Sequence, residues 1–122
     1  MLFDWNTYKD LADELRLRED EASKRSAISR LYYSVYWKAR ISLEKENPHF
    51  RVSADNSHAV VWRSFLDKGI TKRTIFNNGQ QLKKYRQWAD YDSEIPELEE
   101  TVEDSFILAE RLIKTLNSLS GS

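Results

Sequence analysis

The strongest structural signal in the chain is residues 25–40, which read RSAISRLYYSVYWKAR. Apolar side chains recur there at helical spacing, and they are Ile28, Leu31, Val35 and Ala39. A polar and aromatic stripe lies beside them, and its members are Arg25, Ser29, Tyr32, Tyr36 and Arg40, with Tyr33 at its edge. The opposite side, with Arg30, Ser34 and Lys38, is expected to face solvent. So wide an arc predicts a long helix, from about residue 21 to residue 45, that is covered on two sides.

Four further helices are predicted around this one. Apolar residues at helical spacing cover about residues 4–17, 57–68, 71–91 and 96–119, and the second of these is short. Asn47-Pro48 ends the long helix, since the residue before proline disfavours helical geometry. Gly79 is expected to loosen the first turns of the helix that contains it. No segment alternates with a period of two, so no strand is expected. The sequence predicts one domain, residues 1–122, of all-α class: an antiparallel up-and-down four-helix bundle with an additional short helix.

Composition limits the chemistry of the chain. There is no cysteine, which excludes disulfides and thiolate catalysis. The two histidines, His49 and His58, form no zinc-binding pattern, so neither a metal site nor a cofactor is expected. No apolar run approaches the roughly 20 residues of a membrane span. No basic N-terminal region leads into an apolar stretch, as it would in a signal peptide. A cytoplasmic protein without a membrane partner is expected.

The charge is distributed unevenly. Residues 24–86 contain fourteen Lys and Arg against four Asp and Glu, the preceding residues three against seven, and the following residues two against nine. The three segments therefore carry net charges of +10, −4 and −7. A basic middle segment can serve phosphate binding. Alternatively, the acidic end helices pack beside the basic middle helices and neutralise them.

A second informative stretch is residues 85–92, YRQWADYD. Arg86 and Asp90 are four residues apart and so share one face of a helix, and Tyr91 follows at its expected end. An arginine held near an acid and a phenol suits phosphate binding, because a guanidinium is always charged and can bind in bidentate fashion. The alternative is an exposed ion pair that contributes only about 0.3–0.5 kcal/mol.

Other polar and aromatic residues have two readings each. The stripe with Arg25, Ser29 and Tyr33 forms either a groove for bases and phosphates or an aromatic core surface. His58 opens the short helix, as a candidate base or as a cap or surface imidazole. Three tryptophans are expected to point partly outward, to stack on bases or, more commonly, to pack against a second copy of the chain: Trp37, Trp62 and Trp88.

Taken in order, three segments resemble the HEPN family of small helical-bundle domains that bind nucleotides. The first resembles the family's A-x-S-R-x-Y-Y run, matched by Ala27, Ser29, Arg30, Tyr32 and Tyr33. The second, SHAVVWRSF with His58, resembles a His-containing segment of one prokaryotic subgroup. The third resembles that subgroup's R-x-x-A-D-Y helix end, matched by Arg86, Ala89, Asp90 and Tyr91. The resemblance spans nearly the whole chain.

The resemblance implies a HEPN-like bundle that forms a homodimer, with the arginine helices meeting across the interface. Many members are ribonucleases, often toxins paired with a minimal nucleotidyltransferase antitoxin, and others act in antiphage defence. The family's catalytic signature, R-x4-6-H, would place a histidine at position 91, 92 or 93. Tyr91, Asp92 and Ser93 stand there instead, so the histidine is absent.

Three functions stay open from the sequence. In the first, a toxin or defence effector cleaves RNA, with Arg86 on the scissile phosphate and His58, Asp90 or Tyr91 as proton carrier. Nucleotide or RNA contacts would then come from Arg25, Ser29, Arg30 and Tyr33. In the second, a non-catalytic module binds a nucleotide or RNA, or pairs with a nucleotidyltransferase that modifies a tyrosine such as Tyr91. The third is a structural dimer scaffold. The first two require that residues 25–36 and 85–92 meet in space.

Overall fold

The long helix predicted from residues 25–40 is α2 (Glu21–Glu46), and all the other helices of the described chain pack against it. These are α1 (Asn6–Leu15), α3 (Ser57–Arg63), α4 (Ile70–Tyr91) and α5 (Leu98–Gly121). The computed structural model describes residues 2–53, 55–66 and 69–121, and this part of the chain contains no strand. The all-α prediction is therefore confirmed. Among the described residues, no helix is both long enough and apolar enough to cross a bilayer.

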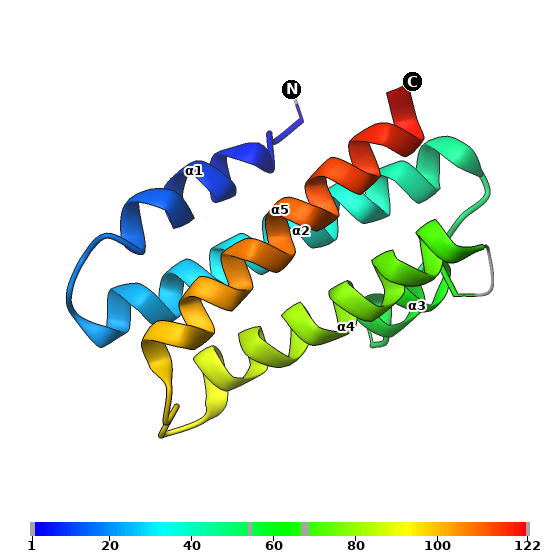
Figure 1. The fold of residues 1–122 in the computed structure, drawn as a ribbon. Helices are drawn as coiled ribbons and strands as arrows, with labels where there is room; N and C mark the ends of the chain where they lie inside the picture. The colour runs from blue at the N-terminus through cyan, green and yellow to red at the C-terminus, as the bar shows by residue number, and fades with distance from the viewer. Residues whose placement is uncertain (1, 54, 67–68, 122) are drawn as a thin grey trace.

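The four long helices lie side by side, and each runs in the opposite direction to the one before it (Figure 1). α5 packs against α2 and α4, whereas α1 packs against α2. The short helix α3 packs against α2 and α4. It lies on the flank away from α1 (Figure 1). α2 and α4, which carry the two informative stretches, are therefore direct neighbours.

Local sequence explains where the central helix begins and ends. The Asp20 carboxylate accepts a hydrogen bond from the backbone N–H of Ser23 at 2.9 Å, as an N-cap residue does. At the other end Asn47 leaves helical geometry in front of Pro48, as predicted. The short helix α3 ends at Arg63, earlier than predicted, and the predicted end at Lys68 lies outside the described residues. Gly69, with φ of +99°, adopts a backbone conformation that only glycine reaches easily, directly before α4.

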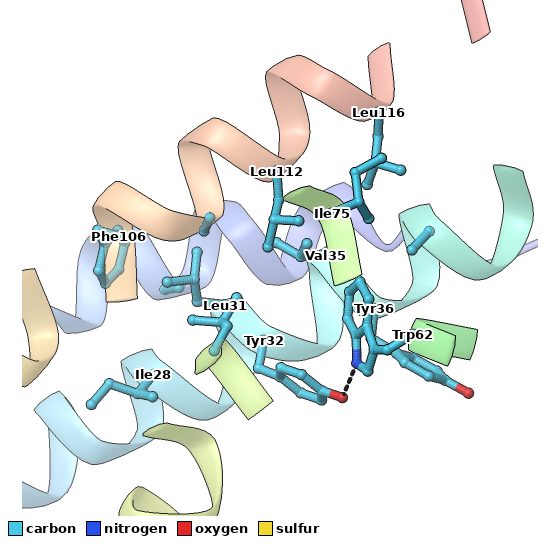
Figure 2. Packing of buried hydrophobic residues seen from close by; sticks show 14 of the residues in the cluster. Ile28, Leu31, Tyr32, Val35, Tyr36, Trp62, Ile75, Phe106, Leu112 and Leu116 are labelled. Carbon is cyan, nitrogen blue, oxygen red and sulfur yellow. Dashed lines mark hydrogen bonds between the residues drawn. The ribbon is translucent and has the colours of Figure 1, made fainter. Parts of the chain in front are cut away.

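The core forms where α2, α4 and α5 meet (Figure 2). The predicted stripe of α2 is fully buried, and it packs with residues of the two other helices that include Ile75, Leu82, Phe106, Leu112 and Leu116. Ser34 was expected to face solvent, but it is buried. Its hydroxyl donates to the Leu31 carbonyl at 2.8 Å, which satisfies it within the helix.

The sequence-based prediction that Trp62 points partly outward is wrong. Its side chain is fully buried rather than turned partly outward. It packs against Gly79 of α4, where an added Cβ would overlap the indole ring. The helix continues through Gly79, which is buried. The glycine therefore allows α3 and α4 to approach each other closely, a role that its helix propensity does not reveal.

Candidate functional site

The two informative stretches meet where α2 crosses α4. Arg86 is only 7% exposed, and its guanidinium lies over two rings of α2, 5.3 Å from the Tyr32 centroid and 5.5 Å from that of Tyr33. The Tyr91 ring, 76% exposed, lies 6.0 Å away on a third side. An arginine among aromatic rings gains cation–π attraction while it loses water. Residues 25–36 and 85–92 therefore meet in space, as the sequence predicted.

The charge of Arg86 is only partly compensated. Its Nη1 lies 3.5 Å from the Asp90 carboxylate, which is itself 30% exposed and accepts a bond from the Ser29 hydroxyl at 3.3 Å. Its Nε is buried and has no hydrogen-bond partner in the described structure. Buried donors are nearly always satisfied, so an unsatisfied guanidinium N–H needs a specific reason. A ligand that accepts hydrogen bonds is such a reason.

His58 of α3 faces the same aromatic rings. Its Nδ1 lies 2.7 Å from the Tyr32 hydroxyl, which also accepts a hydrogen bond from the Trp62 indole N–H at 2.9 Å (Figure 2). The imidazole packs against Tyr36 at 4.4 Å, with the ring planes tilted by 31°, and it meets the edge of Tyr33 at 5.7 Å. Tyr32 and Trp62 are fully buried, whereas His58 is only partly buried. One side of the imidazole is therefore anchored in the core and the other can reach a ligand.

Burial and nearby positive charge lower the pKa of His58. Burial lowers the pKa of His58 from 6.5 to about 4, and the charges of Arg86, Lys83 and Arg40 act in the same direction. Burial likewise lowers the pKa of Lys83, with Arg86 and Arg63 as further causes. At neutral pH the imidazole is uncharged and the arginines are cationic. We call Arg86, His58, Lys83, Tyr32, Tyr33 and Tyr36 the Arg86–His58 cluster.

Arg25 has a different role from the one expected of a ligand-binding residue. Its guanidinium donates to the carbonyl oxygens of Trp88, Ala89, Asp92 and Ser93, and its Nε pairs with the Glu21 carboxylate at 2.7 Å. These carbonyls lie in the last turn of α4 and in the segment directly after it, and that of Trp88 also accepts a hydrogen bond from the Asp92 N–H at 3.0 Å. Arg25 therefore caps the C-terminus of α4 and fixes the helix turn that carries Asp90 and Tyr91.

Other sequence candidates lie apart from the cluster. Arg30 is exposed, and its guanidinium lies 5.0 Å from the Tyr8 ring of α1. Trp37 stacks on Trp5 at 4.6 Å, so it fastens the start of α1 to α2. Of the eight candidates, Arg86, His58, Ser29, Tyr33, Asp90 and Tyr91 are brought together, whereas Arg25 and Arg30 are engaged elsewhere.

Sequence reasoning missed two cations and one anchor of the site. Lys83 lies three residues before Arg86, so helical spacing places both on one face of α4. Arg40 donates to the Tyr36 hydroxyl at 3.3 Å, and Tyr36 in turn packs on His58. No sequence pattern predicts that Trp62 is the partner of Tyr32. α3 has only seven residues, and its buried side depends on how it packs against α2 and α4.

No protein-family model, curated protein or solved structure matches the chain in comparison. Among the described residues, no group of three or more His, Cys, Asp or Glu side chains is placed to hold a metal ion. The function therefore has to be inferred from the residues of the cluster.

Proposed function

We propose that the chain is a HEPN-like RNA-binding domain in which Arg86 holds a backbone phosphate. The observation that carries this proposal is the state of Arg86. It is nine-tenths buried, its Nε has no partner, and its nearest carboxylate is partly exposed. Burying a guanidinium with incomplete compensation costs free energy, so the arrangement is favoured when a ligand completes it.

A backbone phosphate of a polynucleotide suits this environment. Its oxygens can accept from the Arg86 guanidinium, whose buried Nε becomes accessible when the packed side chains move apart, and the rings of Tyr33 and Tyr91 offer faces for the neighbouring bases. Lys83 and Arg40, beside His58, extend the positive charge beyond a single phosphate. A polynucleotide gains from all these cations at once, whereas a mononucleotide gains from few of them.

The finer fold assignment is part of the same proposal. The HEPN resemblance implies an antiparallel four-helix bundle with one short helix. Its three motifs fall on α2, α3 and the end of α4, where their residues meet. The resemblance also motivates a homodimer, a minimal nucleotidyltransferase as partner, and a role in a toxin–antitoxin or antiphage-defence system. Co-expression with a nucleotidyltransferase encoded beside the gene, followed by co-purification, tests the partner.

RNA cleavage is a second candidate function, and the groups beside Arg86 favour it. The uncharged His58 imidazole lies against the same rings as Arg86, where it can donate a hydrogen bond to the proposed phosphate. Asp90 and the exposed Tyr91 are the groups within the site that remain to carry a proton.

Fluorescence anisotropy with a labelled oligouridylate tests the binding proposal. Arg86→Met should weaken saturable binding about tenfold to a hundredfold, whereas Arg18→Met, which removes the same charge from the exposed turn between α1 and α2, should retain it. An equal loss of RNA affinity in both variants would show that only the overall charge of the chain matters. That result would contradict a phosphate site at Arg86. Gel analysis of the same RNA, incubated with a metal chelator, separates binding from cleavage.

A further inference from the structure

The buried Trp62 and Tyr32 and the partly buried His58 form one directed chain of hydrogen bonds. The Trp62 indole N–H donates to the Tyr32 hydroxyl oxygen at 2.9 Å, and that oxygen lies 2.7 Å from His58 Nδ1. An indole nitrogen is only a donor, so the Tyr32 oxygen must accept from Trp62. Within the described chain these are the only hydrogen bonds of the Tyr32 hydroxyl. The hydroxyl proton therefore has one available acceptor, Nδ1 of His58.

The opposite arrangement would leave a buried proton unsatisfied. If His58 carried its proton on Nδ1, the Tyr32 oxygen would accept two hydrogen bonds and its own proton would have no acceptor. Tyr32 and Trp62 are fully buried, so water cannot supply one without displacing packed side chains. Buried donors without a partner are disfavoured. The neutral His58 is thus expected to carry its proton on Nε2.

We propose that Trp62 and Tyr32 are positioning residues that fix His58 with its proton on Nε2, so that His58 donates a hydrogen bond to the ligand. Its role toward a phosphate oxygen rests on the proposed function, whereas the tautomer does not. The basic nitrogen of His58 is turned to Tyr32 and is already occupied. His58 in this state is not a general base.

Burial and, after it, the surrounding charges lower the pKa of His58 and keep the imidazole neutral. Arg86 and Lys83 approach from α4, and Arg40 approaches from α2 through Tyr36. Each disfavours a second proton on the imidazole. The ligand class that follows is one that presents hydrogen-bond acceptors, as phosphate oxygens do. RNA bound at this site should therefore not be cleaved with His58 as its base.

Nuclear magnetic resonance of the imidazole tests the tautomer directly. The chain has only two histidines, so His49→Gln leaves His58 as the sole imidazole signal. At neutral pH we expect a protonated Nε2 and an unprotonated Nδ1 whose ¹⁵N shift shows an accepted hydrogen bond. Tyr32→Phe should remove that hydrogen-bond effect, and Tyr33→Phe, which only meets the ring by its edge, should retain it. A protonated Nδ1 would overturn the proposal. So would an Nδ1 chemical shift that is the same in Tyr32→Phe as in the chain with Tyr32. If Tyr32→Phe does not fold, the protonation of Nδ1 and Nε2 in the His49→Gln chain alone decides the tautomer.

A binding experiment tests the donor role. Glutamine can place an amide N–H where Nε2–H lies, whereas leucine offers no donor. With labelled oligouridylate as the probe, His58→Gln should keep binding within a few-fold of the unsubstituted chain, and His58→Leu should weaken it about tenfold or more. Equal weakening in both variants would contradict the donor role. If the unsubstituted chain binds no RNA, the proposed function fails, while the spectra still decide the tautomer.

Discussion

Replacing Arg86 by methionine should separate function from stability, because the opposing contributions of this residue nearly cancel. The substitution removes an i,i+4 ion pair with a partly exposed Asp90, which contributes about 0.3–0.5 kcal/mol. It also removes cation–π attraction to three tyrosine rings at 5.3, 5.5 and 6.0 Å, about 0.5–1 kcal/mol each. The total loss is about 2–3.5 kcal/mol.

The gain from the same substitution is of similar size. The desolvated Nε without a partner costs about 1–3 kcal/mol, and this cost disappears. The methionine side chain is flexible and apolar, so it can occupy part of the same space between the rings. The Asp90 carboxylate that remains is partly exposed and can be hydrated. We therefore expect the free energy of unfolding to change by no more than about 1 kcal/mol.

Urea denaturation followed by circular dichroism measures that change, and anisotropy with oligouridylate measures the function. Loss of charge-assisted hydrogen bonds to a phosphate should lower affinity about tenfold to a hundredfold. A destabilisation above about 3 kcal/mol would show that Arg86 mainly holds the fold together. Unchanged affinity in a folded Arg86→Met chain would refute the reasoning that assigns the unsatisfied N–H to a ligand.

Three further outcomes follow from the structure. Gly79→Ala should destabilise the chain by about 1–2 kcal/mol in thermal denaturation, because overlap with the Trp62 ring outweighs the gain in helix propensity; a rise in the melting temperature would contradict the close approach. Arg25→Met should cost about 1.5–3 kcal/mol, with faster hydrogen exchange at the end of α4, since the capped carbonyls lose charged donors; unchanged exchange would argue against the cap. Because the pKa of His58 falls from 6.5 unfolded to about 4 folded, only the unfolded chain gains this proton between those values. The free energy of unfolding should therefore decrease as pH falls from 6.5 to 4. In His58→Gln this decrease should be smaller by about 1–2 kcal/mol, after allowance for the partial exposure of the ring. Identical pH profiles of the two chains would contradict a buried, neutral ring.

Helical periodicity was sufficient to predict the framework of the fold. α2 has a wide apolar arc and a proline after its end, so its range was predicted within one residue at its C-terminus. α3 was predicted too long, because seven residues give less than the periodicity needed to place an end. Ser34 was misplaced because a hydroxyl can be buried at little cost when it bonds its own helix.

The site was predictable only in part, for reasons of geometry. Spacing placed Arg86 and Asp90 on one face, and the structure brings that face to Tyr32 and Tyr33. Long-range polar partners leave no local pattern. The cap of α4 by Arg25 joins residues more than sixty positions apart, and the bond between His58 and Tyr32 depends on how α3 docks. Such contacts follow from tertiary packing rather than from any one segment.

The most direct test of the central claim follows the Nε–H resonance of Arg86 while oligouridylate is added to the intact chain. Its hydrogen is buried and has no partner, so a phosphate that binds there must displace packed side chains before it forms the first hydrogen bond of this group. The account predicts a saturable downfield shift of this resonance, with simultaneous shifts at His58. Saturable RNA binding that leaves the Arg86 and His58 signals in place and shifts residues on α1 or α5 instead would contradict it.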